Sequence, residues 1–168
     1  MTNAPPAAPR WPAGVSVRGF QPGQDDHPLQ AMIQEAFADN HEYTPTSFEV
    51  WRTLMIDRES FDPSLWFLAT APSLPQGERE IVGAALCPRY PGQGWVRQLA
   101  VKSEWRRKGV ALALLRTAFA EFYRLGEKQV GLVVNSYNRT GAKNVYERAG
   151  MRVERQHDGY EKDIRSRT

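Results

Sequence analysis

The stretch between residues 94 and 135 constrains the fold more than any other part of the chain. It begins with "GWVRQLAVK" (94–102), which we expect to form a strand. The long apolar run over 109–125 predicts a helix that Gly126 ends. The next segment, "KQVGLVVN" (128–135), is almost continuously apolar, as is typical of a strand buried in a parallel position. This order of strand, helix and strand predicts a mixed α/β sheet.

The rest of the chain supplies further strands and helices around this unit. Thr46 or Ser47 is the expected cap of the second helix, and Asp158 and Gly159 form the expected turn of a C-terminal hairpin. Periodicity and turn residues define the other elements. The predicted strands are 15–20, 64–71, 80–90, 151–157 and 159–164, and the predicted helices are 27–40, 47–56 and 139–149.

Charge and composition narrow the function classes. The net charge is +3, from 22 Lys and Arg against 19 Asp and Glu, which is too small to indicate nucleic-acid binding. No apolar segment approaches the roughly 20 residues that span a membrane. The proline-rich segment 1–14 has no apolar signal core and predicts a flexible tail. Cys87, the single cysteine, is expected in the core, which fits a reduced, cytoplasmic setting.

A cationic turn stands at the start of the long predicted helix, in "WRRKGVALALL" (105–115). The first turn of a helix offers unpaired N–H groups and the positive end of the helix dipole. Gly109 lets a ligand approach this backbone closely, and Arg106, Arg107 and Lys108 add mobile cationic side chains. The turn therefore predicts a site for an anion such as pyrophosphate, although it matches neither a Walker loop nor a dinucleotide fingerprint. A solvated turn before a core helix is the plainer alternative.

A second stretch, "NSYNRTGAKNVYERAGM" (135–151), predicts a short helix with one apolar face. Asn138 stands just before this helix and can cap it. Tyr146 lies on the apolar face but carries a hydroxyl group that needs a polar partner. Taken alone, this pattern also fits core packing of Tyr146. The apolar face consists of Ala142, Val145, Tyr146 and Ala149.

Taken together, the two stretches resemble the GCN5-related N-acetyltransferases (the GNAT family), which use acetyl-CoA. The family pattern Gln/Arg-x-x-Gly-x-Gly/Ala appears here from Arg106 to Ala111. The later pattern Asn-x-x-x-Ala-x-x-x-Tyr-x-x-x-Gly-Phe appears from Asn138 to Met151, where methionine replaces the usual aromatic residue. The order of elements over residues 15–164 is also similar to that of the family.

The resemblance implies roles for the matched positions. The strand backbone at 99–101 would pair with the pantetheine arm of acetyl-CoA, and the N–H groups of 107–111 would bind its pyrophosphate. Tyr146 would lie near the sulfur and return a proton to the departing thiolate. Lys143 would reach a phosphate, and a solvated surface lysine is the alternative for it. The residues implied to bind the cofactor are Leu99, Ala100, Val101, Arg106, Arg107, Lys108, Gly109, Val110, Ala111, Asn138 and Lys143.

The general base is the least determined part of the predicted site. Many relatives carry a glutamate on the strand that here reads "WVRQL", where this chain has Arg97 and Gln98. The acceptor is expected beside the first two helices and their link, over 37–62. His41 and Glu42 in that link are candidates for binding the acceptor or removing its proton, and a plain polar loop is the alternative.

These observations predict one α/β domain over 15–165, with a mixed central sheet of about six or seven strands flanked by about four helices. We expect a cytoplasmic enzyme that transfers an acetyl group from acetyl-CoA to a primary amine of a small molecule or protein, without a metal. A non-catalytic acyl-CoA-binding sensor or interaction module and an O-acyltransferase are the alternatives. Nucleic acid and membranes are not expected partners, and the pattern allows a homodimer.

Overall fold

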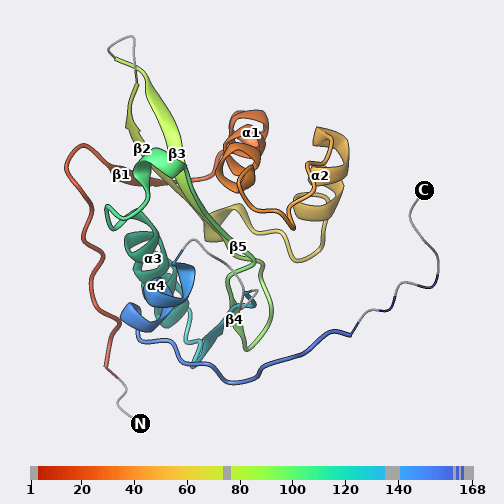
Figure 1. The fold of residues 1–168 in the computed structure, drawn as a ribbon. Helices are drawn as coiled ribbons and strands as arrows, with labels where there is room; N and C mark the ends of the chain where they lie inside the picture. Colours follow the sequence, from red (N-terminus) through yellow and green to blue (C-terminus); the bar gives the residue numbers. More distant parts are fainter. Residues whose placement is uncertain (1–3, 74–76, 135–140, 161, 163, 165–168) are drawn as a thin grey trace.

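The computed structural model describes residues 4–73, 77–134, 141–160, 162 and 164. The described part has the predicted α/β architecture, with a four-stranded antiparallel sheet and a short two-stranded parallel sheet (Figure 1). The elements are β1 (Ser16–Gly19), α1 (Asp26–Phe37), α2 (Phe48–Met55), β2 (Trp66–Pro72), β3 (Arg79–Leu86), β4 (Gly94–Trp95), β5 (Gln98–Val101), α3 (Val110–Arg124), β6 (Val130–Gly131) and α4 (Ala142–Arg148), with short 3₁₀ turns at Pro63–Leu65 and Ser103–Trp105.

Helices cover both faces of the four-stranded sheet, whose order is β1-β2-β3-β5. On one face, α1 and α2 pack over Trp66 and Leu68 of β2. On the other face, the start of α3 packs over Ala69 and Val82. Figure 1 shows α1 and α2 on one side of the sheet and α3 on the other. Burial on both sides explains why β2 and β3 read as apolar runs rather than as an alternation of apolar and polar residues.

Gly83 in β3 fixes how closely α3 approaches the sheet. A Cβ atom at this position would lie 3.1 Å from the carbonyl oxygen of Ala100 and 3.2 Å from the side chains of Val110 and Leu114. A larger residue would push the first turn of α3 away from β3 and β5. The glycine therefore keeps the start of α3, and the turn that precedes it, directly beside β5.

The predicted strand over 94–102 is divided into two strands that belong to different sheets. Among the described residues, β4 pairs only with β6, whereas β5 pairs with β3. The change takes place between neighbouring residues, because the N–H of Val96 donates to Gly131 O (2.9 Å) and the N–H of Arg97 donates to Leu86 O (2.9 Å). The edge of β5 that faces away from β3 consequently has no strand partner among the described residues.

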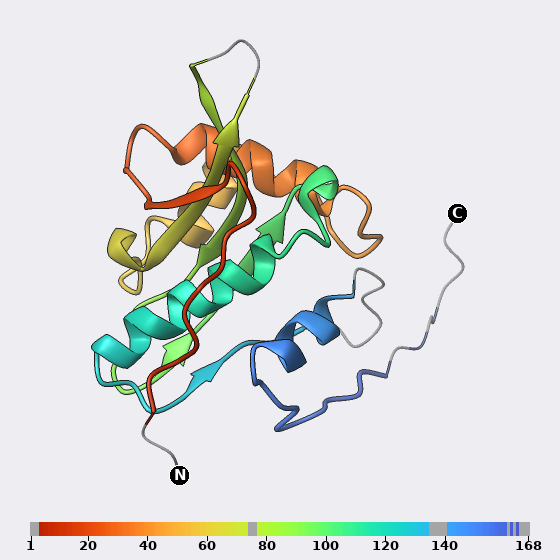
Figure 2. The same ribbon diagram turned by 90° about the vertical axis from the view of Figure 1, so that its left-hand side faces the viewer.

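Two predictions for the C-terminal part of the chain are corrected. The described residues of the predicted strand 128–135 form only the two-residue β6, because its partner β4 is equally short. The predicted hairpin about Asp158 and Gly159 is wrong, since residues 151–160 contain no strand. This segment has few apolar side chains to bury, with Val153 69% exposed and Tyr160 96% exposed, and an isolated hairpin is at best marginally stable. Figure 2 shows the segment running away from the domain.

Other local predictions are confirmed. The Ser47 hydroxyl caps α2 by accepting the N–H of Val50, and Cys87 is fully buried, where burial raises the pKa of its thiol. Trp11, in the segment before residue 15, packs against the cluster beneath α3, and the flexibility of that segment stays a prediction. Figure 2 shows this segment running alongside α3. Within the described residues, no helix combines the length and the apolar character that crossing a membrane requires.

Candidate functional site

A cleft of about 490 Å³ follows the unpaired edge of β5. The end of α1 forms one wall, α4 and the residues just after β6 form the other, and the turn before α3 closes one end. The sequence-predicted site residues that line the cleft are Leu99, Val101, Arg106, Arg107, Gly109, Val110, Ala111 and Tyr146. The two stretches singled out in the sequence therefore meet at one cavity.

Several other predicted residues do not line the cleft. Ala100 is buried beneath α1, and its register opposite Ala84 turns its N–H and C=O groups toward β3 rather than toward the cleft. Lys108 and Lys143 are exposed side chains outside the lining. His41 and Glu42 are likewise exposed, in the link that follows α1. Asn138 lies outside the described residues, and its predicted role stays a prediction.

The turn before α3 has the backbone geometry of an anion site. Arg107 adopts φ +59° and Gly109 adopts φ +90°, so two of three consecutive residues are left-handed. Such a conformation is unfavourable for arginine, and it turns successive N–H groups toward a common concavity. A Cβ at Gly109 would have no heavy atom within 4 Å. The backbone is therefore open at the point where α3 begins and offers its first N–H groups.

Arg106 ties this turn to the end of α1. Its Nη1 donates to Asp39 Oδ2 (2.7 Å), and its Nη2 donates to Asp39 Oδ1 (3.1 Å) and to Ala36 O (2.5 Å). Its Nε also reaches Val101 O at the end of β5 (3.4 Å). These hydrogen bonds lower the pKa of the Asp39 carboxyl group. The expectation that Arg106 is a mobile cationic arm is therefore wrong: its side chain connects the end of α1 to the end of β5.

Arg107 and Lys108, unlike Arg106, have the exposed cationic side chains that were expected at the turn. Both side chains are exposed, and neither forms an ion pair with a carboxylate of the described residues. Lys108 Nζ lies 4.9 Å from the centroid of the Trp105 ring, which places a positive charge beside the turn. The turn thus combines oriented N–H groups with two cations that an anionic ligand could engage.

Tyr146 faces the turn from α4 across the cleft. Val145, Tyr146 and Ala149 pack against the core cluster that contains Leu115 and Phe122, as the predicted apolar face requires. Tyr146 also lines the cleft, and burial raises the pKa of its phenol. No group among the described residues forms a hydrogen bond with its hydroxyl. The phenol therefore keeps its proton at neutral pH and can donate it to a ligand.

The end of the cleft away from the turn is polar but contains little acid. Arg97 and Gln98 line it, and Asp39 is the single carboxylate among the described residues that line the cleft. The sequence pattern identifies Arg97 and Gln98 only as the place where a carboxylate is missing and predicts no binding role for them. The described residues bring together no cluster of three or more His, Cys, Asp or Glu side chains that could hold a metal ion.

Comparisons with known proteins agree with this geometry. The model of the family described as "Acetyltransferase (GNAT) family" matches residues 29–151. A solved GCN5-related N-acetyltransferase from Sphaerobacter thermophilus is 39% identical, with a TM-score of 0.77 over 90% of this chain and 45% of that chain. A mycothiol acetyltransferase from Thermobispora bispora is 32% identical over 150 residues, which cover 89% of this chain and 50% of that protein.

A further mycothiol acetyltransferase, from Cellulomonas flavigena, is 27% identical over 162 residues, or 90% of this chain and 44% of that protein. The chain spans about half the length of the curated relatives it matches. The similarity therefore covers nearly all of this chain but only part of each relative.

The contacts of Arg106 predict unequal effects of its removal and of the removal of Asp39. Asp39 is 59% exposed, so a double-mutant cycle at neutral pH should give a coupling of only about 0.2–1 kcal/mol. Arg106→Ala should lower the free energy of unfolding more than Asp39→Ala, because it also removes the bonds to Ala36 O and Val101 O. Urea unfolding of the four proteins provides the measurement.

The same cycle has a predicted pH dependence. Because the pKa of Asp39 is lowered in the folded state, its stabilisation is complete above the unfolded carboxyl value and is lost as the pH falls through the folded value. The coupling should therefore shrink in acid. Equal losses from the two single variants, or a coupling that does not change with pH, would contradict this account of the junction.

Proposed function

The chain belongs to the acetyltransferase (GNAT) family, and we propose that it transfers an acetyl group from acetyl-CoA to a primary amine. One observation carries the proposal: the unpaired edge of β5 leads directly into the anion-binding turn before α3, with Tyr146 on the opposite wall. This arrangement suits a ligand with an extended amide-containing arm and a pyrophosphate. The relatives named mycothiol acetyltransferases support acetyl transfer as the reaction.

The described residues fit acetyl-CoA along the whole cleft. The N–H and C=O groups of Leu99 and the N–H group of Val101 can pair with the amides of the arm, as an added strand would. The N–H groups of 107–111 can bind the pyrophosphate, and the open backbone at Gly109 admits it without a clash. Arg107 and Lys108 add charge at this end, whereas Lys143 and Asn138 remain proposed contacts.

Tyr146 is the proposed acid of the reaction. When bound, acetyl-CoA supplies an acyl group activated as a thioester. The Tyr146 hydroxyl has a raised pKa and faces the cleft, so it holds a proton that it can give to the departing sulfur. Backbone N–H groups at the splayed end of β5 can stabilise the negative charge that develops on the carbonyl oxygen.

The acceptor amine must react in its neutral form. For an amine with a reference pKa of about 10.4, reaching that form at pH 7 costs about 4.6 kcal/mol. Asp39, the single carboxylate among the described lining residues, is already bonded to Arg106. We therefore propose that the proton leaves through water to Glu42 or His41, or that the acceptor arrives partly neutral.

Binding of acetyl-CoA should raise the melting temperature by mass action. At a hundred times the dissociation constant the stabilisation is about 2.7 kcal/mol, or about 5–10 °C for a chain of this size. Gly109→Asp should abolish the shift, because it places a side chain and a negative charge at the pyrophosphate site. Gly92→Asp is the matched control, since Gly92 also has a positive φ and open surroundings but lies outside the cleft. An unchanged melting temperature of the folded wild type would refute the assignment of the cofactor.

Tyr146→Phe should lower turnover by about ten- to a thousand-fold, because it removes the proton donor and keeps the ring. The thermal shift with acetyl-CoA should stay close to that of the wild type. Tyr160→Phe serves as the control, because Tyr160 is 96% exposed and does not line the cleft. Steady-state assays of thiol release provide the measurement, and full activity of Tyr146→Phe would return this residue to a packing role.

The pH dependence of turnover distinguishes the two routes for the amine proton. A dedicated base, such as Glu42 or His41, would give a rate that rises with pH and then becomes constant once that base has lost its proton. An amine that ionises in bulk water would give a rise that continues toward its own pKa. Glu42→Gln and His41→Gln should be profiled with the best acceptor, and a tenfold loss in one of them would identify the base. Two unchanged profiles would exclude both residues from proton transfer.

A further inference from the structure

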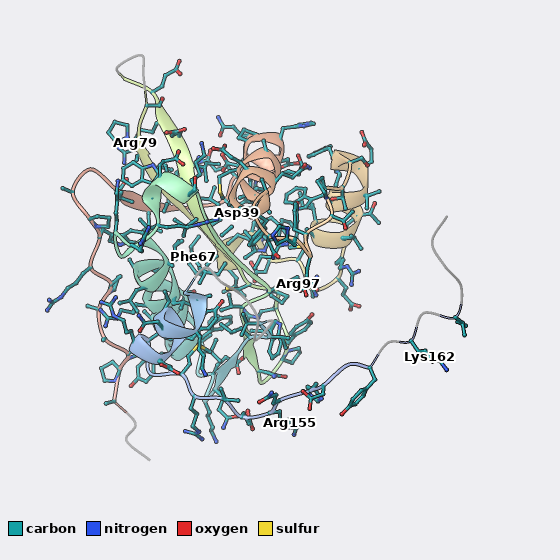
Figure 3. The ribbon with its side chains drawn as sticks, viewed as in Figure 1. Asp39, Phe67, Arg79, Arg97, Arg155 and Lys162 are labelled. Carbon is teal, nitrogen blue, oxygen red and sulfur yellow. The ribbon has the colours of Figure 1, made fainter. Side chains whose placement is uncertain are left out.

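Arg97 is a cationic residue of the cleft for which the proposed reaction has no role. Its side chain lies where β4 and β5 separate, and Figure 3 shows it beside β5. It is partly buried and lines both the main cleft and a small neighbouring cavity beneath α2. Its Nη2 donates to the Tyr90 hydroxyl (2.8 Å), and its Nη1 makes a long contact with Leu54 O (3.4 Å). Both partners are uncharged, so its positive charge is not balanced by them.

Arg106, which is also partly buried, has a carboxylate partner. Its guanidinium pairs with Asp39 at 2.7 Å. No ion pair joins Arg97 to a carboxylate of the described residues. A charge that is partly withdrawn from water without an opposite charge is unfavourable, and a bound anion removes that cost.

The position of Arg97 separates this charge from the pyrophosphate site. Arg97 precedes β5, whereas Arg107 follows it, and the four residues of β5 span about 13 Å. A phosphate held at the turn before α3 therefore cannot also neutralise Arg97. The anion that Arg97 binds must come from the molecule that occupies the opposite end of the cleft, which is the acceptor.

Gln98 supplies a second polar group at the same end. Its Oε1 atom is buried and has no hydrogen-bond partner among the described residues. A buried carbonyl oxygen of this kind needs a donor, because leaving it unpaired costs the free energy of its lost hydration. The N–H of an acceptor amine is such a donor. Arg97 and Gln98 together are therefore complementary to a molecule that carries both an amine and an anionic group.

Resting on the proposed acetyl transfer, we infer that the acceptor is an amine that carries a carboxylate, which the Arg97 guanidinium binds. The Tyr90 hydroxyl accepts from Arg97 and keeps its own proton to donate to the second carboxylate oxygen. One guanidinium beside one neutral hydroxyl suits a singly charged carboxylate better than a doubly charged phosphate. Amino acids, or chain ends that contain both groups, have the required chemistry.

The test uses ω-amino carboxylic acids of increasing chain length, each compared with its primary amide, and measures kcat/KM with acetyl-CoA. The wild type should prefer the acid for at least one chain length, by about tenfold to a hundredfold, the range expected for one hydrogen bond to a charged group. Arg97→Gln should remove the preference by raising KM for the acid and leaving the amide unchanged. Arg97→Lys should keep part of it, because it retains the charge and loses the planar fork.

Arg58→Gln is the matched control, since Arg58 is exposed and lies outside the cleft, and it should keep the full preference. The thermal shift with acetyl-CoA is measured for every variant, so that loss of cofactor binding is separated from loss of acceptor choice. If Arg97→Gln does not fold, Tyr90→Phe should still weaken the preference. A wild type that binds acetyl-CoA but acetylates none of the acids, or favours the amides, overturns the inference, as does a preference that survives Arg97→Gln.

Discussion

The fold of the site depends on how two neighbouring backbone N–H groups are divided between two sheets. Val96 donates to β6 and Arg97 donates to β3, so the chain leaves one sheet and enters the other within a single peptide unit. This separation opens the edge of β5 and creates the cleft between α1 and α4. A continuous strand over 94–102 would pair with both neighbours and leave no free N–H and C=O groups for a ligand.

The positive charges of the cleft lie at its two opposite ends, and this separation is the second feature on which the site depends. Arg106 bonds to Asp39 and to carbonyl groups at the ends of α1 and β5, so it joins these two ends and its charge is paired with Asp39. Arg107 remains available at the turn, and Arg97 remains available at the far end of β5. The cleft is thus positive at both ends, with a phenol between them that holds its proton. This distribution matches an anionic cofactor at one end and an anionic acceptor at the other.

The local elements could be predicted from the sequence because they depend on short-range patterns. A few neighbouring residues are enough to predict that Gly109 begins an apolar helix and that Tyr146 lies on the apolar face of a helix. The role of Asp39 could not be predicted, because its partner Arg106 is 67 residues away in the sequence and the ion pair exists only after folding. The division of 94–102 was equally hidden, since it depends on which strand each N–H meets. The hairpin after 151 failed because alternation alone does not supply enough apolar surface to hold a strand in a sheet.

A crystal structure of the protein with acetyl-CoA tests the central claim most directly. The account predicts that the pyrophosphate oxygens lie within hydrogen-bond distance of N–H groups in 107–111, that the arm runs along the backbone of Leu99 and Val101, and that the sulfur lies near the Tyr146 hydroxyl. Continued pairing of Arg106 with Asp39 in the complex would support its structural role. A cofactor bound with its phosphates away from this turn, or with its arm off the edge of β5, would contradict the account.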